Sequence, residues 1–551
     1  MKSFIDKYFY FFLAIAIAIN VPGLLLGVLD QDSALYASIA KTIVTKNDWL
    51  NLYSYGTDWL DKPHFPFWME AISMKLFGIN AFAYKLPSFI FWLIGSWYTY
   101  KLAVLIYNKN VAQLSVIIYM TALHILLANF DVRAEGFLTA LTIAAIYHLI
   151  CWNNQFSYKH FILAALTTAM AVMTKGIFIT ISIGGGLVWY CIWTNQYKRL
   201  LTIKNIFFIL LVIILCFPEL YSLYYQFDLH PEKVVFNKTG VSGIRFFLWD
   251  SQFGRFFNSG PIKGEGDISF YLHTTIWAFL PWSFILIPAI WQQFSKRAEY
   301  RSPSLMKYIT GSALISFLLF SFSKFQLPHY IVILFPHFAI ISATYLLSNL
   351  KENIYLKLSS IQLVVFTLVY VLIIVLLYYA HIPYSFLLIG IISIIYIVLM
   401  WIVIRNYQYS ILLVGLGITS ILSIFLFGGF YTFLFQYQAG MQAGRTISTK
   451  YQGLPVMEWN IENSGLLRFY STSSIAILKN DKELNHSLVQ NSTLLLFTKP
   501  QEADSLKAKG YHIQQLEQFD LFRVTMLNTE FLNPATRSNT LQKRCLLLVS
   551  R

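Results

Sequence analysis

Charged side chains are scarce in this chain, yet several gather in one stretch near the N-terminus. Only 12% of the 551 residues are charged. The stretch 30–68 nevertheless contains Asp30, Asp32, Asp48, Asp58, Asp61 and Lys62. A carboxylate can deprotonate an acceptor hydroxyl, and Lys or Arg can stabilise the charge that grows on a departing phosphate. Transfer from a phosphate-linked donor is therefore one chemistry among several that this stretch could serve.

The composition is that of a membrane protein. Hydrophobic residues make up 57% of the sequence and the mean hydropathy is +0.57, whereas about a quarter of the residues in soluble globular proteins are charged. The net charge of +15 does not indicate nucleic-acid binding, because no basic cluster is interleaved with aromatic residues on a polar domain. An excess of Lys and Arg is typical of cytoplasmic loops. We therefore expect a polytopic α-helical protein that contacts membrane lipids and no nucleic acid.

Apolar runs long enough to span a bilayer recur along the chain. A spanning helix needs about twenty apolar residues, or somewhat fewer when its ends are anchored. We expect thirteen transmembrane helices, at residues 8–29, 83–107, 111–128, 134–152, 161–174, 176–193, 205–225, 271–293, 308–322, 328–348, 357–380, 384–404 and 409–436. The first run lacks a small-residue cleavage site, so we expect a retained helix.

Basic residues orient these helices. The stretch 161–193 is apolar except for Thr174-Lys175-Gly176, so it forms either one long helix or two short ones. Two helices place the main basic groups on one side: Lys2, Lys7, Lys198, Arg199, Lys204, Lys296, Arg297, Arg301 and Lys307. The positive-inside rule favours this solution. It puts the N-terminus in the cytoplasm and the C-terminus outside, in the periplasm if the membrane is a bacterial inner membrane.

Two long outer loops and a polar C-terminal region complete the expected architecture. The loops are residues 30–82 and 226–270 of a membrane domain that covers 1–437. In the first loop, Leu35, Ile39 and Ile43 recur at helical spacing, which predicts an amphipathic helix lying along the membrane surface. Residues 438–551 are polar and should form a small soluble α/β domain. Its predicted strands are 454–459, 466–470, 493–498 and 519–526, with a helix at 502–509.

With this topology, many of the remaining polar residues share the outer face. They are Asp32, Asp61, Lys62, Asp131, Arg133, Lys175, Asp250, Arg255, Lys324, His329 and Tyr330. The helix that ends at Lys175 has about fourteen residues, or ~21 Å, which is shorter than the ~30 Å hydrocarbon layer. A lysine there lies below the outer surface, where a charge is costly unless it is paired or functional. The alternative is that its ammonium snorkels to the headgroups.

Motifs in a fixed order carry a resemblance to a known family. They are Asp32 with Tyr36-Ala37, Asn47-Asp48-Trp49, Asp61-Lys62-Pro63, Phe67-Trp68, Phe77-Gly78, Leu86-Pro87-Ser88, Asp131, Thr174-Lys175-Gly176, Trp249-Asp250, Arg255-Phe256, Phe279-Leu280-Pro281-Trp282, Lys324, Leu327-Pro328 and Tyr330. In this order the chain resembles the lipid A aminoarabinose transferases and the dolichyl-phosphate-mannose–protein mannosyltransferase-like enzymes, which have the GT-C membrane fold. The resemblance covers the membrane part, whereas the last hundred residues match weakly.

The resemblance implies an inverting glycosyltransferase. Such an enzyme moves a sugar from a polyprenyl-phosphate donor, here undecaprenyl phosphate, to a lipid A-like lipid or a protein acceptor on the outer face of the inner membrane. We expect a monomer. A transporter or flippase of polyprenyl-linked sugars is the alternative, but that class should place charges near the membrane midplane on broken helices. A relative that binds the lipid carrier without catalysis is a third possibility.

The resemblance also implies roles for individual residues. Asp32 would be the base that activates the acceptor, with Asp30 as its rival. Asp131 would orient Lys62 or take part at the reacting centre. Around the donor phosphate the family places the counterparts of Lys62, Lys175, Arg255 and Tyr330.

A metal site is implied at Asp61 and Asp250. Some relatives bind a metal ion at these positions and have histidine at the second, which is Asp250 here. Because carboxylates suit harder cations, the departure would favour Mg²⁺ or Mn²⁺ over Zn²⁺. Ser33 and Leu35 replace residues that are often charged in the family, which leaves the type of acceptor open.

Overall fold

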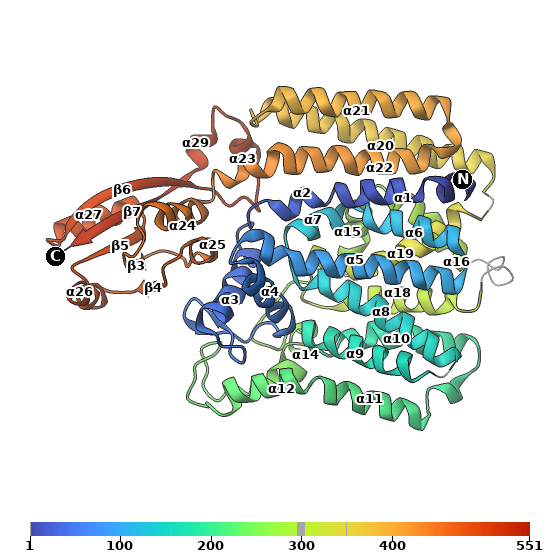
Figure 1. Ribbon diagram of the computed structural model, residues 1–551, viewed down its shortest axis with the longest axis horizontal. Helices are drawn as coiled ribbons and strands as arrows, with labels where there is room; N and C mark the ends of the chain where they lie inside the picture. The colour runs from blue at the N-terminus through green and yellow to red at the C-terminus, as the bar shows by residue number, and fades with distance from the viewer. Residues whose placement is uncertain (1, 156, 295–302, 349, 551) are drawn as a thin grey trace.

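The computed structural model describes residues 2–155, 157–294, 303–348 and 350–550. Lys296, Arg297 and Arg301, which belong to one predicted cytoplasmic loop, lie outside these ranges. Most of the chain forms a block of helices that run side by side, and a sheet projects from one end of the block (Figure 1). The N-terminus lies at the opposite end of the block from the sheet.

The helical block contains most of the secondary structure. Its elements in chain order are α1 (Lys2–Ala18), α2 (Val21–Leu25), α3 (Asp32–Lys46), β1 (Tyr53–Ser54), β2 (Thr57–Asp58), α4 (Phe65–Phe77), α5 (Ala81–Ile106), α6 (Lys109–Met120), α7 (Leu123–Phe130), α8 (Ala134–Asn154), α9 (Tyr158–Lys175), α10 (Ile179–Trp193), η1 (Tyr197–Arg199), α11 (Ile203–Leu215), α12 (Phe217–Leu223), η2 (Tyr224–Asp228), α13 (Gly243–Arg245), η3 (Phe246–Asp250), α14 (Phe253–Phe256), α15 (Phe270–Ala278), α16 (Ser283–Gln293), α18 (Met306–Phe322), η4 (Pro328–Leu334), α19 (Phe335–Leu346), α20 (Glu352–Tyr379), α21 (Ser385–Arg405), η5 (Tyr407–Tyr409), α22 (Ser410–Phe425), η6 (Leu426–Phe430) and α23 (Tyr431–Phe435).

These helices confirm a polytopic membrane protein. In the described part of the chain, 7 helical segments are long and apolar enough to cross a membrane, or up to 9 if the bent pairs α6–α7 and α11–α12 each count as one. The remaining predicted spans fall on α9, α10, α15–α16 and α18, which are shorter or less apolar than the others. In Figure 1, α20–α22 flank one side of the block, α11 and α12 flank the other, and α5 and α8 lie between them.

The helix predicted to lie along the membrane is instead covered by protein. Helix α3 forms at the predicted place, but Ile39 and Ile43 are buried in a cluster with Phe67 and Ala71 of α4. Both helices lie at the end of the block that carries the sheet (Figure 1). The helical spacing of the apolar residues thus predicted the helix correctly. The expectation that the stripe faces the bilayer was wrong, because α4 supplies the apolar surface that covers it.

The C-terminal region is a five-stranded mixed sheet with helices. Its elements are α24 (Ala439–Lys450), β3 (Val456–Trp459), α25 (Gly465–Tyr470), β4 (Ile475–Leu478), α26 (Asp481–Gln490), β5 (Thr493–Thr498), α27 (Pro500–Ala508), β6 (His512–Leu521), α28 (Thr529–Leu532), α29 (Arg537–Thr540) and β7 (Gln542–Ser550). The strand order is β4-β3-β5-β7-β6, with β3 parallel to β4 and β5, and β7 antiparallel to both neighbours. Leu494, Leu496 and Leu547 are fully buried in its core.

One predicted strand of this region is a helix. Residues 466–470 belong to α25, where the Ser464 side chain accepts a hydrogen bond from the Leu467 amide and caps the first turn. A short apolar run does not by itself distinguish a strand from a buried helix. The N-cap serine and the burial of Leu466, Leu467 and Phe469 decide for the helix.

Helix α25 attaches the sheet to α3. The Lys41 ammonium donates to the carbonyl oxygens of Arg468 at 2.7 Å and Phe469 at 3.3 Å, and also to that of Ser471. Gly465 packs directly on α3, since a Cβ there would lie 2.9 Å from the Leu35 nitrogen. The C-terminal sheet is therefore fixed to the helix whose first residue is Asp32.

Candidate functional site

Arg133 joins two of the predicted carboxylates. Its Nε donates to Asp131 at 3.1 Å, and its Nη1 bonds the carboxylate of Asp32 at the start of α3. The Asp32 side chain remains 44% exposed. The other oxygen of Asp131, Oδ1, is buried without a hydrogen-bond partner, and burial raises the pKa of Asp131 above its ordinary value. Asp131, whose side chain is 22% exposed, therefore acts as an anchor for Arg133, while Asp32 is the carboxylate more open to solvent.

Asp61 joins two of the predicted phosphate-binding cations. One of its oxygens bonds the Lys62 ammonium and the other bonds the Arg255 guanidinium, although Arg255 lies on α14, far along the chain. Burial opposes ionisation of this carboxyl, but Lys62 and Arg255 hold the pKa of Asp61 below its ordinary value. The resulting cluster carries one net positive charge.

Lys175 forms a second cluster beside the first. Its ammonium bonds Glu135 of α8 and lies 3.2 Å from the centroid of the Tyr330 ring. The backbone carbonyl of Lys175 accepts a hydrogen bond from Gln252 at 3.1 Å. Gly176 makes this approach possible: its φ is +102°, and a Cβ there would lie 2.2 Å from the Gln252 amide nitrogen.

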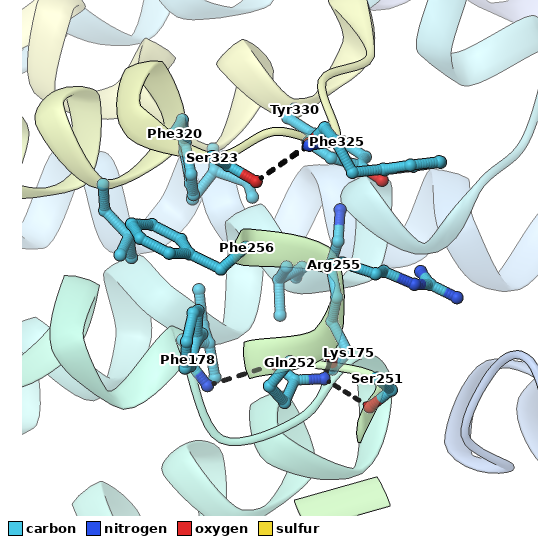
Figure 2. Close-up of a pocket in the computed structure, with 14 residues that line it drawn as sticks. Lys175, Phe178, Ser251, Gln252, Arg255, Phe256, Phe320, Ser323, Phe325 and Tyr330 are labelled. Carbon is cyan, nitrogen blue, oxygen red and sulfur yellow. Dashed lines mark hydrogen bonds between the residues drawn. The ribbon is translucent and has the colours of Figure 1, made fainter. Parts of the chain in front are cut away.

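Adjoining cavities bring the predicted residues together. One of about 140 Å³ is lined by Asp32, Asp61, Lys62, Arg133, Glu135 and Tyr330, among others. A second, of about 100 Å³, contains Lys175, Arg255 and Tyr330 (Figure 2). In Figure 2, the aromatic rings of Phe178, Phe256 and Phe320 line the side of this cavity away from the Arg255 guanidinium. A third, of only about 20 Å³, is lined by Lys62, Lys175 and Arg255 together.

The two candidate metal ligands do not meet in one cluster. Asp61 uses both oxygens on cations, and Asp250 lines a different cavity, where one oxygen lies 3.7 Å from Nε of Arg245. Within the described ranges, no group of three or more His, Cys, Asp and Glu side chains is arranged to hold a metal. Asp61 and Asp250 therefore do not form a shared donor set that fits a divalent cation.

Asp30, the rival of Asp32, points elsewhere. Its carboxylate accepts a hydrogen bond from the Gln31 amide at 2.8 Å, and its own amide donates to the Gln438 side chain at 2.7 Å. Burial raises the pKa of Asp30. Asp32, in contrast, lines the cavity that contains Asp61 and Lys62.

Glu219 and Gln252 did not stand out in the sequence, and no partner was predicted for Glu135. Glu135 bonds Lys175, Glu219 bonds the ring and the amide of His64 at 3.0 Å each, and Gln252 bonds the Lys175 carbonyl. Glu219 could have been found, because it is an acid within the apolar run 205–225 and intramembrane carboxylates are usually functional. Nothing in the sequence marked Gln252 as a site residue, because neutral polar side chains are common in loops.

Comparisons with known proteins agree with this architecture. The family model described as dolichyl-phosphate-mannose-protein mannosyltransferase matches residues 61–221. A protein of Aquifex aeolicus, described as uncharacterized, is 27% identical over 332 residues, 59% of this chain and 60% of that protein. The undecaprenyl phosphate-alpha-4-amino-4-deoxy-L-arabinose arabinosyl transferase 1 of Pseudomonas fluorescens (strain Pf0-1) is 23% identical over 330 residues, 57% of this chain and 55% of the relative. The chain thus matches less than two thirds of the length of these relatives.

A solved structure extends the agreement to nearly the whole chain. ArnT from Cupriavidus metallidurans, crystallised with undecaprenyl phosphate, superposes with a TM-score of 0.75 over 98% of both chains, at 16% identity. A match of this extent includes the C-terminal sheet, which the sequence motifs did not cover. The chain therefore has the GT-C fold and is similar to the arabinosyl transferases and to the mannosyltransferase family.

Proposed function

We propose that this protein is an inverting glycosyltransferase that uses a polyprenyl-phosphate sugar, of which undecaprenyl phosphate is the carrier, as its donor. The observation that carries the proposal is the convergence of Lys62, Lys175 and Arg255 on one cavity. Three cations from separate parts of the chain can bind the donor phosphate and stabilise the charge that it gains as it leaves. The named arabinosyl transferase relative supports this donor class.

The lining of the neighbouring cavity suits a lipid-linked phosphate. Lys175 and Arg255 lie beside the rings of Phe178, Phe256 and Phe320 (Figure 2). A polyprenyl phosphate has a charged head and an apolar tail, so cations next to aromatic rings match both ends of the group that leaves. Tyr330 holds Lys175 from its ring face, which is a cation–π contact.

In the proposed reaction, Asp32 is the base. The acceptor hydroxyl oxygen forms a bond to the anomeric carbon of the sugar while the bond from that carbon to the phosphate oxygen breaks. The proton of the hydroxyl passes to Asp32, and polyprenyl phosphate departs with the electron pair. Arg133 orients Asp32, and Asp131 orients Arg133. Because Asp32 is more exposed than Asp131 and lines the cavity that contains Lys62, Asp131 serves the reaction through Arg133.

The membrane placement is part of the proposal. Residues 1–437 form the catalytic membrane domain, residues 438–551 a periplasmic domain, and the N-terminus is cytoplasmic in a bacterial inner membrane. The opposite positions of the N-terminus and the sheet in Figure 1 support this orientation. The acceptor is a lipid A-like lipid, as the resemblance of the motifs implies, or a protein, and the enzyme acts as a monomer. A transporter is disfavoured because the charged clusters crowd the cavities near α3 and α14.

The test combines transfer by the full-length protein in lipid nanodiscs with mass spectrometry of envelope lipids and glycoproteins. Undecaprenyl-phosphate sugars are the donors. We expect the wild type to transfer the sugar. The Asp32→Asn variant should be slower by a factor of about 10²–10⁴, which is the usual contribution of a general base. The variant should still bind undecaprenyl phosphate, since the cations are intact. Asp30→Asn is the matched control and should retain activity. Normal turnover by Asp32→Asn would refute the assigned base.

A further inference from the structure

Glu135 is a buried carboxylate that the proposed reaction does not use. It lies in the first turn of α8, and its side chain is 4% exposed. One oxygen bonds the Lys175 ammonium, and the other lies 3.7 Å from Nε2 of His329. Glu135 therefore joins three elements, α8, α9 and η4, at the wall of the cavity that also contains Asp32 and Lys62.

Lys175 needs such a partner. The charged and titratable groups around its ammonium are Glu135 on α8, His329 and Tyr330 on η4, Asp61 and Lys62 in the first outer loop and Arg255 on α14. Lys62 and Arg255 repel an ammonium, and the one carboxylate between them, Asp61, pairs with both. Neither His329 nor Tyr330 supplies a negative charge near neutral pH. A buried cation without a counter-ion gives up its proton rather than remain charged.

We propose that Glu135 is a positioning residue that keeps Lys175 charged and directed at the donor phosphate. The inference rests on the proposed function of Lys175 at the donor phosphate. It extends that function by naming the group that keeps Lys175 protonated. One oxygen of Glu135 bonds the ammonium and the Tyr330 ring lies 3.2 Å from it, so the lysine is held by both a carboxylate and an aromatic face. When the donor phosphate arrives, the ammonium can contact it without first paying for its own ionisation.

The geometry also explains why Glu135 is not the base. Both of its oxygens are occupied by basic groups, whereas the Asp32 side chain is 44% exposed. A carboxylate that is almost fully buried, with Lys175 on one oxygen and His329 near the other, has no oxygen that an acceptor hydroxyl can reach. Its effect on transfer must therefore pass through Lys175.

The decisive variant is Glu135→Gln, which keeps the shape of the side chain and removes its charge. Donor KM and kcat are measured in nanodiscs with an undecaprenyl-phosphate sugar between about pH 6 and pH 9, a range in which a phosphodiester donor keeps a constant charge. We expect donor KM to rise about tenfold or more at the alkaline end, as for the loss of one charge-assisted bond. It should recover toward the wild-type value as pH falls and Lys175 regains its proton. The kcat should change less than KM, and Glu135→Asp should retain most donor affinity.

A double variant isolates the charge from other titrations. In Glu135→Gln/Lys175→Arg, the guanidinium stays protonated throughout this range. The donor KM of this double variant should therefore vary with pH no more than that of the wild type. His329, Lys62 and Arg255 are unchanged in both variants, so they cannot account for the difference. If Glu135→Gln does not fold, Glu135→Asp takes its place, and the rise of its donor KM should begin at a lower pH than in the wild type.

Each result decides a specific point. A pH-independent loss in Glu135→Gln, or a loss of kcat with unchanged donor KM, would overturn the inference and indicate a structural or directly chemical role. Failure of the proposed function gives a different result: Lys175→Met would then have the donor KM of the wild type, whatever Glu135→Gln does.

Discussion

Leu52 and Gln226 bond each other in both directions. The Leu52 amide donates to Oε1 of Gln226 at 2.9 Å, and Nε2 of Gln226 donates to the Leu52 carbonyl at 2.8 Å. The same Nε2 also donates to Asp58 at 2.9 Å, and Lys233 bonds the same Asp58 oxygen at 2.9 Å. Gln226 is fully buried. The two long outer loops, far apart in sequence, are thus joined by one amide side chain.

Replacing this amide should loosen both loops. Gln226→Leu removes three hydrogen bonds and leaves buried groups of Leu52 unpaired, so we expect a loss of about 1–3 kcal/mol in local stability. Hydrogen exchange of the 48–60 segment in nanodiscs measures it. Gln452→Leu is the matched control, because Gln452 is exposed and its side chain donates to the Ser448 carbonyl near the end of α24. Equal exchange in the two variants would contradict a joining role for Gln226.

Both cations that bond Asp61 should be needed for tight binding of the lipid donor. Lys62→Met and Arg255→Met each remove one charged partner of the donor phosphate and one of Asp61. We expect donor KM to rise by about ten- to a hundredfold in each, since a hydrogen bond to a charged group contributes about 1.5–3 kcal/mol. Steady-state kinetics with varied lipid donor provides the measurement.

Lys324→Met is the control for these cation variants. Lys324 was grouped with the site in the sequence, but its side chain is exposed and the site cavities are lined by other residues. If Lys324→Met raised donor KM as much as Lys62→Met, nonspecific attraction of the lipid would explain the effect better than a defined phosphate site.

The membrane part of the fold was predictable because its signals are local. A run of about twenty apolar residues specifies a spanning helix without reference to its neighbours, and the predicted runs coincide with helical segments. Contacts between distant segments carry no such signal. The stripe of Ile39 and Ile43 predicted a helix, but nothing in the sequence says that α4 rather than lipid covers it. The strand prediction for residues 466–470 was wrong for a related reason. Ser464 can be recognised as an N-cap only once the helix that follows it is known.

The sequence predicted which residues line the candidate site better than it predicted which side chains they bond. Motif order grouped Asp32, Lys62, Lys175 and Arg255, and the structure brings them to adjoining cavities. The partners of Asp61 were not foreseen, because a pair of carboxylates in two loops also suits a metal ion. Lys62 and Arg255 occupy Asp61 instead.

This arrangement predicts that transfer does not require a divalent cation. Treatment of the purified protein with a chelator should leave transfer within about twofold of the untreated rate. The reason is that Lys62, Lys175 and Arg255 supply the positive charge at the phosphate that a metal ion would otherwise supply. Asp250→Asn should likewise retain activity, since Asp250 faces Arg245 rather than Asp61. Loss of transfer on chelation, with recovery on adding Mg²⁺, Mn²⁺ or Zn²⁺, would show that Asp61 exchanges its cations for a metal.

The attachment of the sheet to α3 should depend on pH through Lys41. Burial lowers the pKa of Lys41 from 10.5 to about 8 in the folded protein. Since the unfolded chain then binds more protons between pH 8 and 10.5, the cost of burying this charge is fully present below pH 8 and is relieved as pH rises through that window. The wild type should therefore gain stability relative to Lys41→Met on going from pH 8 to pH 10, as measured by thermal unfolding in detergent. Lys482→Met, at an exposed position of α26, should show no such trend. A constant difference between wild type and Lys41→Met would mean that the ammonium bonds to α25 fully offset its burial.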